Sequence, residues 1–201
     1  MFNVLSHGSG FVLSSLGLIH IWENHGHALN LWQWCVLLLY AGSWIGLYAC
    51  STLYHASRHL QRKAFLRVLD HCAIFIVIAA SYGPFVLFAI NDRTGRILLS
   101  ISWMIALLGC VFKFTSVYRY HVQSTWAYMF QGWLVFFNLR TLLANISTAG
   151  FLSMMVGGVF MTVGTYFYIR DDVKYNHGAW HICVILGGLG FFLAILELLP
   201  T

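Results

Sequence analysis

The chain contains a series of apolar runs, each long enough to cross the hydrocarbon core of a lipid bilayer as a helix. A helix rises about 1.5 Å per residue, so roughly 20 apolar residues are needed to span that core. Runs of this kind cover residues 2–22, 31–53, 68–90, 97–114, 128–143, 151–169 and 179–199. They predict an all-α integral membrane bundle of seven transmembrane helices. Six helices is the alternative, because Arg140 interrupts the fifth run.

The composition favours burial in lipid over exposure to water. Of the 201 residues, 60% are hydrophobic and only 8% are charged, whereas a soluble domain has about 25% charged residues. So few charges could not cover a water-exposed surface, but a lipid-facing surface needs no such cover. Because the chain has only two prolines and no low-complexity tract, we expect a single transmembrane domain over residues 1–201.

The net charge of +5 comes from basic residues in the loops. Their distribution predicts how the chain is oriented in the membrane, and it does not indicate nucleic acid binding. Membrane proteins keep an excess of Lys and Arg on the cytosolic side of their short loops. If the N-terminus is cytosolic, that side holds eight of the eleven Lys and Arg residues: Arg58, Arg62, Lys63, Arg67, Lys113, Arg119, Arg170 and Lys174. We therefore expect a cytosolic N-terminus and an external C-terminus, and no nucleic acid partner.

The small residues in these runs predict helix packing and not chemistry. Glycines recur at Gly157, Gly158, Gly164, Gly187, Gly188 and Gly190, where they would let helix backbones approach closely. The five cysteines are Cys35, Cys50, Cys72, Cys110 and Cys183, and none forms a CxxC pair. We interpret them as small buried hydrophobic residues, with no disulfide framework or thiolate metal site.

Polar and ionisable residues inside the runs indicate where a functional site lies. Such groups are costly in a membrane, so they usually face the bundle interior and serve a function. The informative ones are His7, Ser51, His55, Asp70, His71, His177 and His181. Under the predicted orientation all of them lie near the cytosolic leaflet, although they come from both ends of the chain. We therefore expect one site at that depth.

The spacing of two of these histidines is compatible with a shared metal ion. His177 and His181 are four residues apart, which places both rings on one helix face, one turn apart. A third histidine would leave the fourth tetrahedral position of a zinc ion open for water, which could ionise near pH ~7. Asp70 could then orient that water or shuttle its proton. Ser51, one turn before His55, could hydrogen-bond behind the ligands.

Histidines at this spacing also occur without any metal. His55 and His59 are likewise four residues apart, and a chain with ten histidines contains such pairs by chance. We expect His59 to be an exposed loop residue, because Gln61, Arg62 and Lys63 follow it. Asp70 could instead be a carboxylate at a helix N-terminus, favoured there by the helix dipole, and His71 could neutralise it.

Taken in order, these residues resemble the haemolysin III-type proteins of the progestin and adipoQ receptor superfamily. The matching patterns are N-x3-H at Asn3–His7, S-x3-H at Ser51–His55, the aspartate at Asp70, and H-x3-H at His177–His181. The resemblance implies seven helices with a cytosolic N-terminus. It also implies a zinc ion held by His55, His177 and His181, supported by Ser51 and Asp70, with Asn3 and His7 further out.

The same resemblance leaves three functions open. Animal relatives are linked to ceramidase-like hydrolysis of lipid amides, which implies a zinc-dependent hydrolase acting on membrane lipids. The names of bacterial relatives refer to haemolysis, which implies a pore-forming cytolysin or channel. The third function is a receptor or membrane-homeostasis regulator whose zinc is structural.

Two features depart from the family pattern. Family members usually have a glutamate shortly before N-x3-H, whereas here Met1 and Phe2 precede Asn3. Bacterial relatives often have a histidine late in the last helix, where this chain has Gly190 and Phe191. Because the chain lacks the long N-terminal extension of animal receptors, we expect its location to be a prokaryotic cell membrane.

Overall fold

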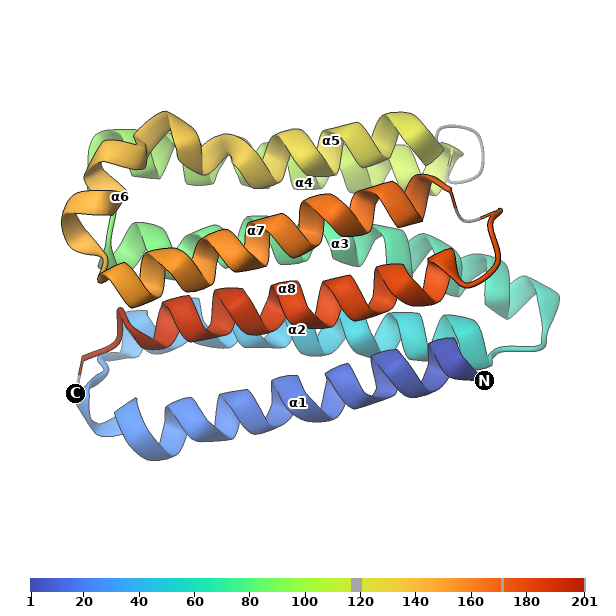
Figure 1. The fold of residues 1–201 in the computed structure, drawn as a ribbon, viewed down its shortest axis with the longest axis horizontal. Helices are drawn as coiled ribbons and strands as arrows, with labels where there is room; N and C mark the ends of the chain where they lie inside the picture. Colours follow the sequence, from blue (N-terminus) through green and yellow to red (C-terminus); the bar gives the residue numbers. More distant parts are fainter. Residues whose placement is uncertain (117–120, 171, 201) are drawn as a thin grey trace.

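The computed structural model describes residues 1–116, 121–170 and 172–200, apart from the side chains at positions 116 and 121. Arg119, which entered the charge count above, lies outside these residues. Within them the regular structure is helical (Figure 1): α1 (Phe2–His25), η1 (Gly26–Ala28), α2 (Leu31–Ala56), α3 (Leu60–Phe88), α4 (Arg93–Ser116), α5 (His121–Trp133), η2 (Leu134–Asn138), α6 (Leu139–Asn145), α7 (Thr148–Ile169) and α8 (Asn176–Leu196).

Six of these helices are long and apolar enough to cross a membrane: α1, α2, α3, α4, α7 and α8. One more pass is made by α5, η2 and α6 together. It is the fifth in chain order, and we call it the seventh pass because it completes the set of seven. The prediction of an all-α, seven-helix membrane bundle is therefore confirmed. Most predicted spans differ from the helices by about one turn at either end. Which side of the membrane each end faces stays a prediction.

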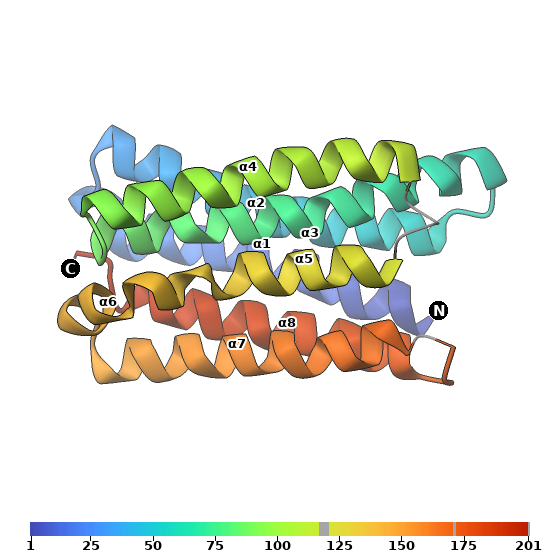
Figure 2. The same ribbon diagram turned by 90° about the horizontal axis from the view of Figure 1, so that it is seen from above.

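The first and last helices of the bundle pack against each other. From α1 to α4 each helix packs against the next, and α8 packs against α7 and also against α1 (Figure 2). The N- and C-termini lie at opposite ends of the bundle (Figure 1). We call the end that contains Met1, the α2–α3 connection and the start of α8 the Met1 end. This arrangement brings residues from both extremes of the sequence to one place.

The third helix begins at Leu60 and not at residue 68, so the predicted start was wrong. His59 is its N-cap, and the imidazole accepts a hydrogen bond from the backbone N–H of Arg62 over 3.5 Å. Residues 60–65 are exposed and partly charged, so a search for apolar runs does not detect this extension. As predicted, His59 is exposed and lies in the loop between α2 and α3, where it also caps the start of α3.

The seventh pass is broken in the middle of the bundle, at a place the sequence does not mark. Arg140 was expected to interrupt it, but α5 ends at Trp133 and continues as the 3-10 segment η2. Tyr82 of α3 compensates for the lost backbone bonds. Its hydroxyl donates to the carbonyls of Gln131 (2.8 Å) and Gly132 (2.9 Å) and accepts from the N–H of Val135 (3.0 Å). A membrane-buried backbone needs such partners, because no water is available there.

Glycines bring the backbones of α7 and α8 into contact, as the sequence predicts. A Cβ atom added to Gly190 would lie 2.7 Å from the backbone nitrogen of Gly157 and 2.7 Å from the carbonyl oxygen of Ser153. A Cβ on Gly157 would lie 3.0 Å from the carbonyl oxygen of Gly187. Each of these neighbours is backbone and cannot rotate away, so α7 and α8 form a closely joined pair.

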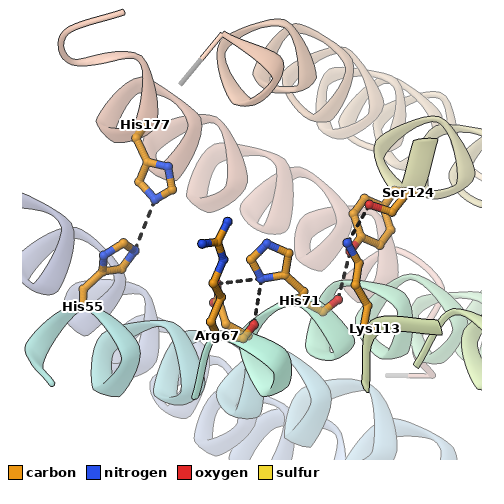
Figure 3. Close-up of polar contacts among 8 residues, drawn as sticks. His55, Arg67, His71, Lys113, Ser124 and His177 are labelled. Atoms are coloured by element: carbon orange, nitrogen blue, oxygen red, sulfur yellow. Dashed lines mark hydrogen bonds and ion pairs between the residues drawn. The ribbon is translucent and has the colours of Figure 1, made fainter. Parts of the chain in front are cut away.

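Lys113 is not the loop residue that the charge count assumed. It lies within α4 and its side chain is fully buried. The ammonium donates a hydrogen bond of 2.6 Å to the hydroxyl of Ser124 on α5 (Figure 3). It also lies 5.8 Å from the centre of the Tyr128 ring. A buried charge needs such partners, so Lys113 ties α4 to α5.

The cysteines are free thiols, but they are not uniformly buried. Cys72 and Cys183 are buried, Cys50 and Cys110 are half-buried, and Cys35 is exposed on α2. The prediction of burial is therefore wrong for Cys35, because an apolar residue on a membrane helix can face lipid as readily as the protein interior.

Asp92 organises the turn between α3 and α4. Its carboxylate accepts from the backbone N–H of Gly95 (2.6 Å), from the Asn138 amide (3.0 and 3.1 Å) and from the Thr141 hydroxyl (3.1 Å). These donors, the Gly95 N–H foremost, lower the pKa of the Asp92 carboxyl. Asp92 thus fixes the far end of the seventh pass against the α3–α4 turn.

Candidate metal centre

Three histidines from two helices converge at the Met1 end of the bundle. The last turn of α2 contributes His55, and the first two turns of α8 contribute His177 and His181. The Nε2 atoms of His55 and His177 are 3.2 Å apart (Figure 3). One nitrogen from each of the three rings can be chosen so that all lie within 4.8 Å of one another.

This geometry fits a shared metal ion. Two nitrogens bound to a tetrahedral zinc ion at 2.0–2.1 Å lie about 3.3 Å apart, close to the separation of His55 and His177. His181 is buried and the other two rings are half-buried. Three neutral imidazoles are a suitable ligand set for zinc and for other late first-row metals. The triad could therefore hold a metal ion whose identity the geometry leaves open.

An unusual turn precedes two of these ligands. Tyr175 has φ = 72°, and it is the one non-glycine residue with positive φ in the described parts of the chain. Bulky residues rarely adopt this conformation, and such outliers concentrate at functional sites. The Asn176 side chain donates to the carbonyl of Arg170 over 2.8 Å and closes the same turn. The turn sets the direction in which α8 begins.

A carboxylate and a hydroxyl lie beside the triad. Asp70 of α3 has a side chain that is 14% exposed, and the Ser51 hydroxyl of α2 interacts with it. His71 Nδ1 donates to the carbonyl of Arg67 over 2.8 Å (Figure 3). The same nitrogen lies 3.6 Å from a carboxylate oxygen of Asp70. Since α3 begins at Leu60, Asp70 is well beyond the first turn, where the helix dipole acts. The interpretation of Asp70 as a carboxylate at a helix N-terminus is therefore wrong.

The first helix contributes three polar residues to the same region. The His7 ring stacks on the His181 ring, with centroids 3.5 Å apart and planes inclined by 11°. Ser6 Oγ lies 2.9 Å from His181 Nδ1, and Asn3 faces the same space. Sequence reasoning identified Asn3 and His7 but missed Ser6. A serine next to a histidine in the sequence does not indicate a functional role until the helix that it contacts is known.

All the polar residues singled out from the sequence line one cavity of about 430 Å³. They are Asn3, His7, Ser51, His55, Asp70, His71, His177 and His181. Away from them the wall is mainly apolar and aromatic and includes Ile78, Phe85, Phe136, Met154 and Phe191 from α3, η2, α7 and α8. Cavities of this size hold small-molecule ligands. The chemical roles of the individual residues stay predictions.

Comparison with known proteins places this chain in a family. Residues 1–192 match the family model described as "Haemolysin-III related". The chain belongs to the haemolysin-III family. It is 36% identical over 197 residues to the hemolysin-3 homolog of Bacillus subtilis (strain 168), covering 96% of this chain and 91% of that protein.

Two further relatives extend this comparison. Hemolysin-3 of Bacillus cereus is 34% identical over 203 residues, covering 99% of this haemolysin-III-family chain and 91% of that protein. The human monocyte to macrophage differentiation factor is 23% identical over 174 residues, covering 83% and 71%. It is a member of the progestin and adipoQ receptor superfamily. The chain is thus a multi-pass membrane protein with bacterial relatives and with a histidine triad that could hold a metal ion.

Proposed function

We propose that this chain is a zinc-dependent hydrolase of lipid amides, similar to a ceramidase, with its site near the cytosolic leaflet of a prokaryotic cell membrane. One observation carries the proposal: the three imidazoles and Asp70 open onto the same cavity, whose remaining wall is largely apolar. A lipid amide has a polar amide beside a long acyl chain, and this cavity has the same division.

The residues around the cavity suit such a reaction. Zinc, when bound, would polarise the substrate carbonyl and make a water molecule nucleophilic near neutral pH. Asp70, which lines the same cavity, would accept a proton from that water and pass it to the leaving amine. Ser51 would orient the Asp70 carboxylate, and the apolar wall would hold the acyl chain.

Metal analysis beside an activity assay tests the proposal. Wild-type protein and the variants His55→Ala, Asp70→Ala and His59→Ala would be purified in detergent. Zinc content would be measured, and hydrolysis of a fluorescent short-chain ceramide would be followed. We expect His55→Ala to lose both zinc and activity, and Asp70→Ala to keep zinc but lose activity. His59→Ala is the matched control, because His59 is exposed and lies outside the cavity.

Different outcomes would select different functions. A fully zinc-loaded wild type that cleaves no N-acyl lipid contradicts hydrolysis. If chelation then lowers its melting temperature, a structural zinc in a receptor or regulator is favoured. The Bacillus cereus relative carries the name Hemolysin-3, which motivates lysis as the second candidate. Release of dye from liposomes that His55→Ala leaves unchanged would favour it.

The proposed orientation has its own test. A cytosolic N-terminus and an external C-terminus place the Met1 end, and with it the site, at the cytosolic face. Alkaline phosphatase fused after residue 201 should then be active in a bacterial host. A fusion in the α2–α3 connection should be inactive, and the reverse pattern would contradict the orientation.

A further inference from the structure

We infer that Ser6 is a positioning residue for His181, and this inference rests on the proposed metal site. In this arrangement the Ser6 hydroxyl accepts a hydrogen bond from Nδ1–H of His181. The Nε2 lone pair of His181 is then directed toward His55 and His177. The first helix thus presets a ligand that the last helix carries.

The contact between these two residues is short and buried. Ser6 Oγ lies 2.9 Å from His181 Nδ1, and 175 residues separate the two in the sequence. Ser6 is 8% exposed and His181 is 1% exposed. A hydrogen bond protected from water in this way holds its geometry and fixes which ring nitrogen carries the proton.

The surroundings determine the direction of this hydrogen bond. The Ser6 hydroxyl donates its single hydrogen to the carbonyl oxygen of Asn3 over 3.2 Å, which leaves an oxygen lone pair for His181. The Asn3 carbonyl also interacts with the His181 ring, and a carbonyl can only accept. With the Ser6 hydrogen committed to Asn3, the contact of Ser6 Oγ with Nδ1 is made by a proton on Nδ1 of neutral His181, so Nε2 is the nitrogen free to bind metal.

The neighbouring residue of the same helix restricts the ring further. His7 is 3% exposed and stacks against the face of His181, with ring centroids 3.5 Å apart. The stack limits rotation of the His181 ring out of the plane that Ser6 selects. Metal-binding histidines generally rely on such a partner for the second nitrogen, and losing that partner costs about 10–100-fold in metal affinity.

Zinc affinity tests this role without any activity measurement. The purified full-length protein would be stripped of metal and titrated with zinc against a chromophoric chelator. We expect Ser6→Ala to weaken zinc binding about 10–100-fold and Ser6→Thr, which keeps the hydroxyl, to stay close to wild type. Ser9→Ala should have no effect. Ser9 is exposed one turn further along α1, and its hydroxyl bonds a carbonyl instead of the histidine.

A second measurement separates failure of this inference from failure of the metal site. In metal-free protein labelled with ¹⁵N-histidine, the His181 signals can be assigned by their loss in His181→Gln. We expect a protonated Nδ1 and an unprotonated Nε2 in the wild type, and loss of this preference in Ser6→Ala. A protonated Nε2, or wild-type zinc affinity in Ser6→Ala, would overturn the inference. A wild type with the expected tautomer that takes up no zinc would refute the proposed function alone.

Discussion

Replacing Tyr82 by phenylalanine should destabilise the bundle through one lost hydroxyl. The ring stays, so packing is conserved, and the change removes only the oxygen that serves the broken seventh pass. That oxygen donates to the carbonyls of Gln131 and Gly132 and accepts from the N–H of Val135. Tyr82 is 6% exposed, so these backbone groups would lose their partner in a buried position.

The expected magnitude follows from the number of groups affected. Leaving one buried donor or acceptor unsatisfied costs about 1–3 kcal/mol. The N–H of Val135 loses its acceptor, and the two carbonyls share a single lost hydrogen, so we expect a total of about 2–4 kcal/mol. For a chain of this length that corresponds to a fall in melting temperature of roughly 5–15 °C.

Thermal unfolding in one detergent, followed by tryptophan fluorescence, would measure this fall. Tyr166→Phe is the matched control, because Tyr166 is 57% exposed on α7 and its hydroxyl accepts a hydrogen bond from the side chain of Arg170, with no backbone partner among the described residues. We expect the control to melt at the wild-type temperature. If Tyr82→Phe also melts there, the hydroxyl does not sustain the break in the seventh pass, and the reasoning is refuted.

Two further predictions concern the glycine contact and the α3–α4 turn. Gly190→Ala places a Cβ against the backbone of Gly157 and should lower the free energy of unfolding by about 1–3 kcal/mol. Gly42→Ala on α2 is the control, because the space around Gly42 is open. Equal melting temperatures of the two variants would contradict the close approach of α7 and α8. The lowered pKa of Asp92 means that its carboxylate stabilises the fold at neutral pH. This contribution is present above the unfolded pKa of about 3.9 and is lost as the pH falls through the lower folded pKa. The difference in stability between wild type and Asp92→Asn should therefore shrink as the pH falls below about 4, and a constant difference would exclude this role.

The helices could be predicted from the sequence where they depend on the length and composition of one apolar run. Apolar length identified all seven spans, and glycine spacing identified the contact of α7 with α8, because both depend on local composition. The start of α3 was missed because its first turns are polar and project beyond the apolar run. The break after Trp133 was missed because Tyr82, which bonds the backbone groups freed there, lies on another helix.

The site was predictable to the extent that it depends on depth in the membrane. Polar residues that interrupt apolar runs at the same end of their helices must come together in a closed bundle, and this placed His55 beside His177. Partners across helices carry no such mark. The contact of Ser6 with His181 depends on the packing of α1 on α8, and the burial of Lys113 depends on the packing of α4 on α5. Neither packing can be predicted from the pattern of a single sequence.

The placement of the triad on α2 and α8 has a consequence for biogenesis. Chains enter the membrane from the N-terminus as they are synthesised, so His55 is in place long before the last helix exists. The histidines of α8 reach it only after every other span has inserted, since 122 residues separate His55 from His177. Metal capture would therefore report that the whole bundle has been assembled, and an unfinished or misrouted chain would stay metal-free and distinguishable from the mature protein.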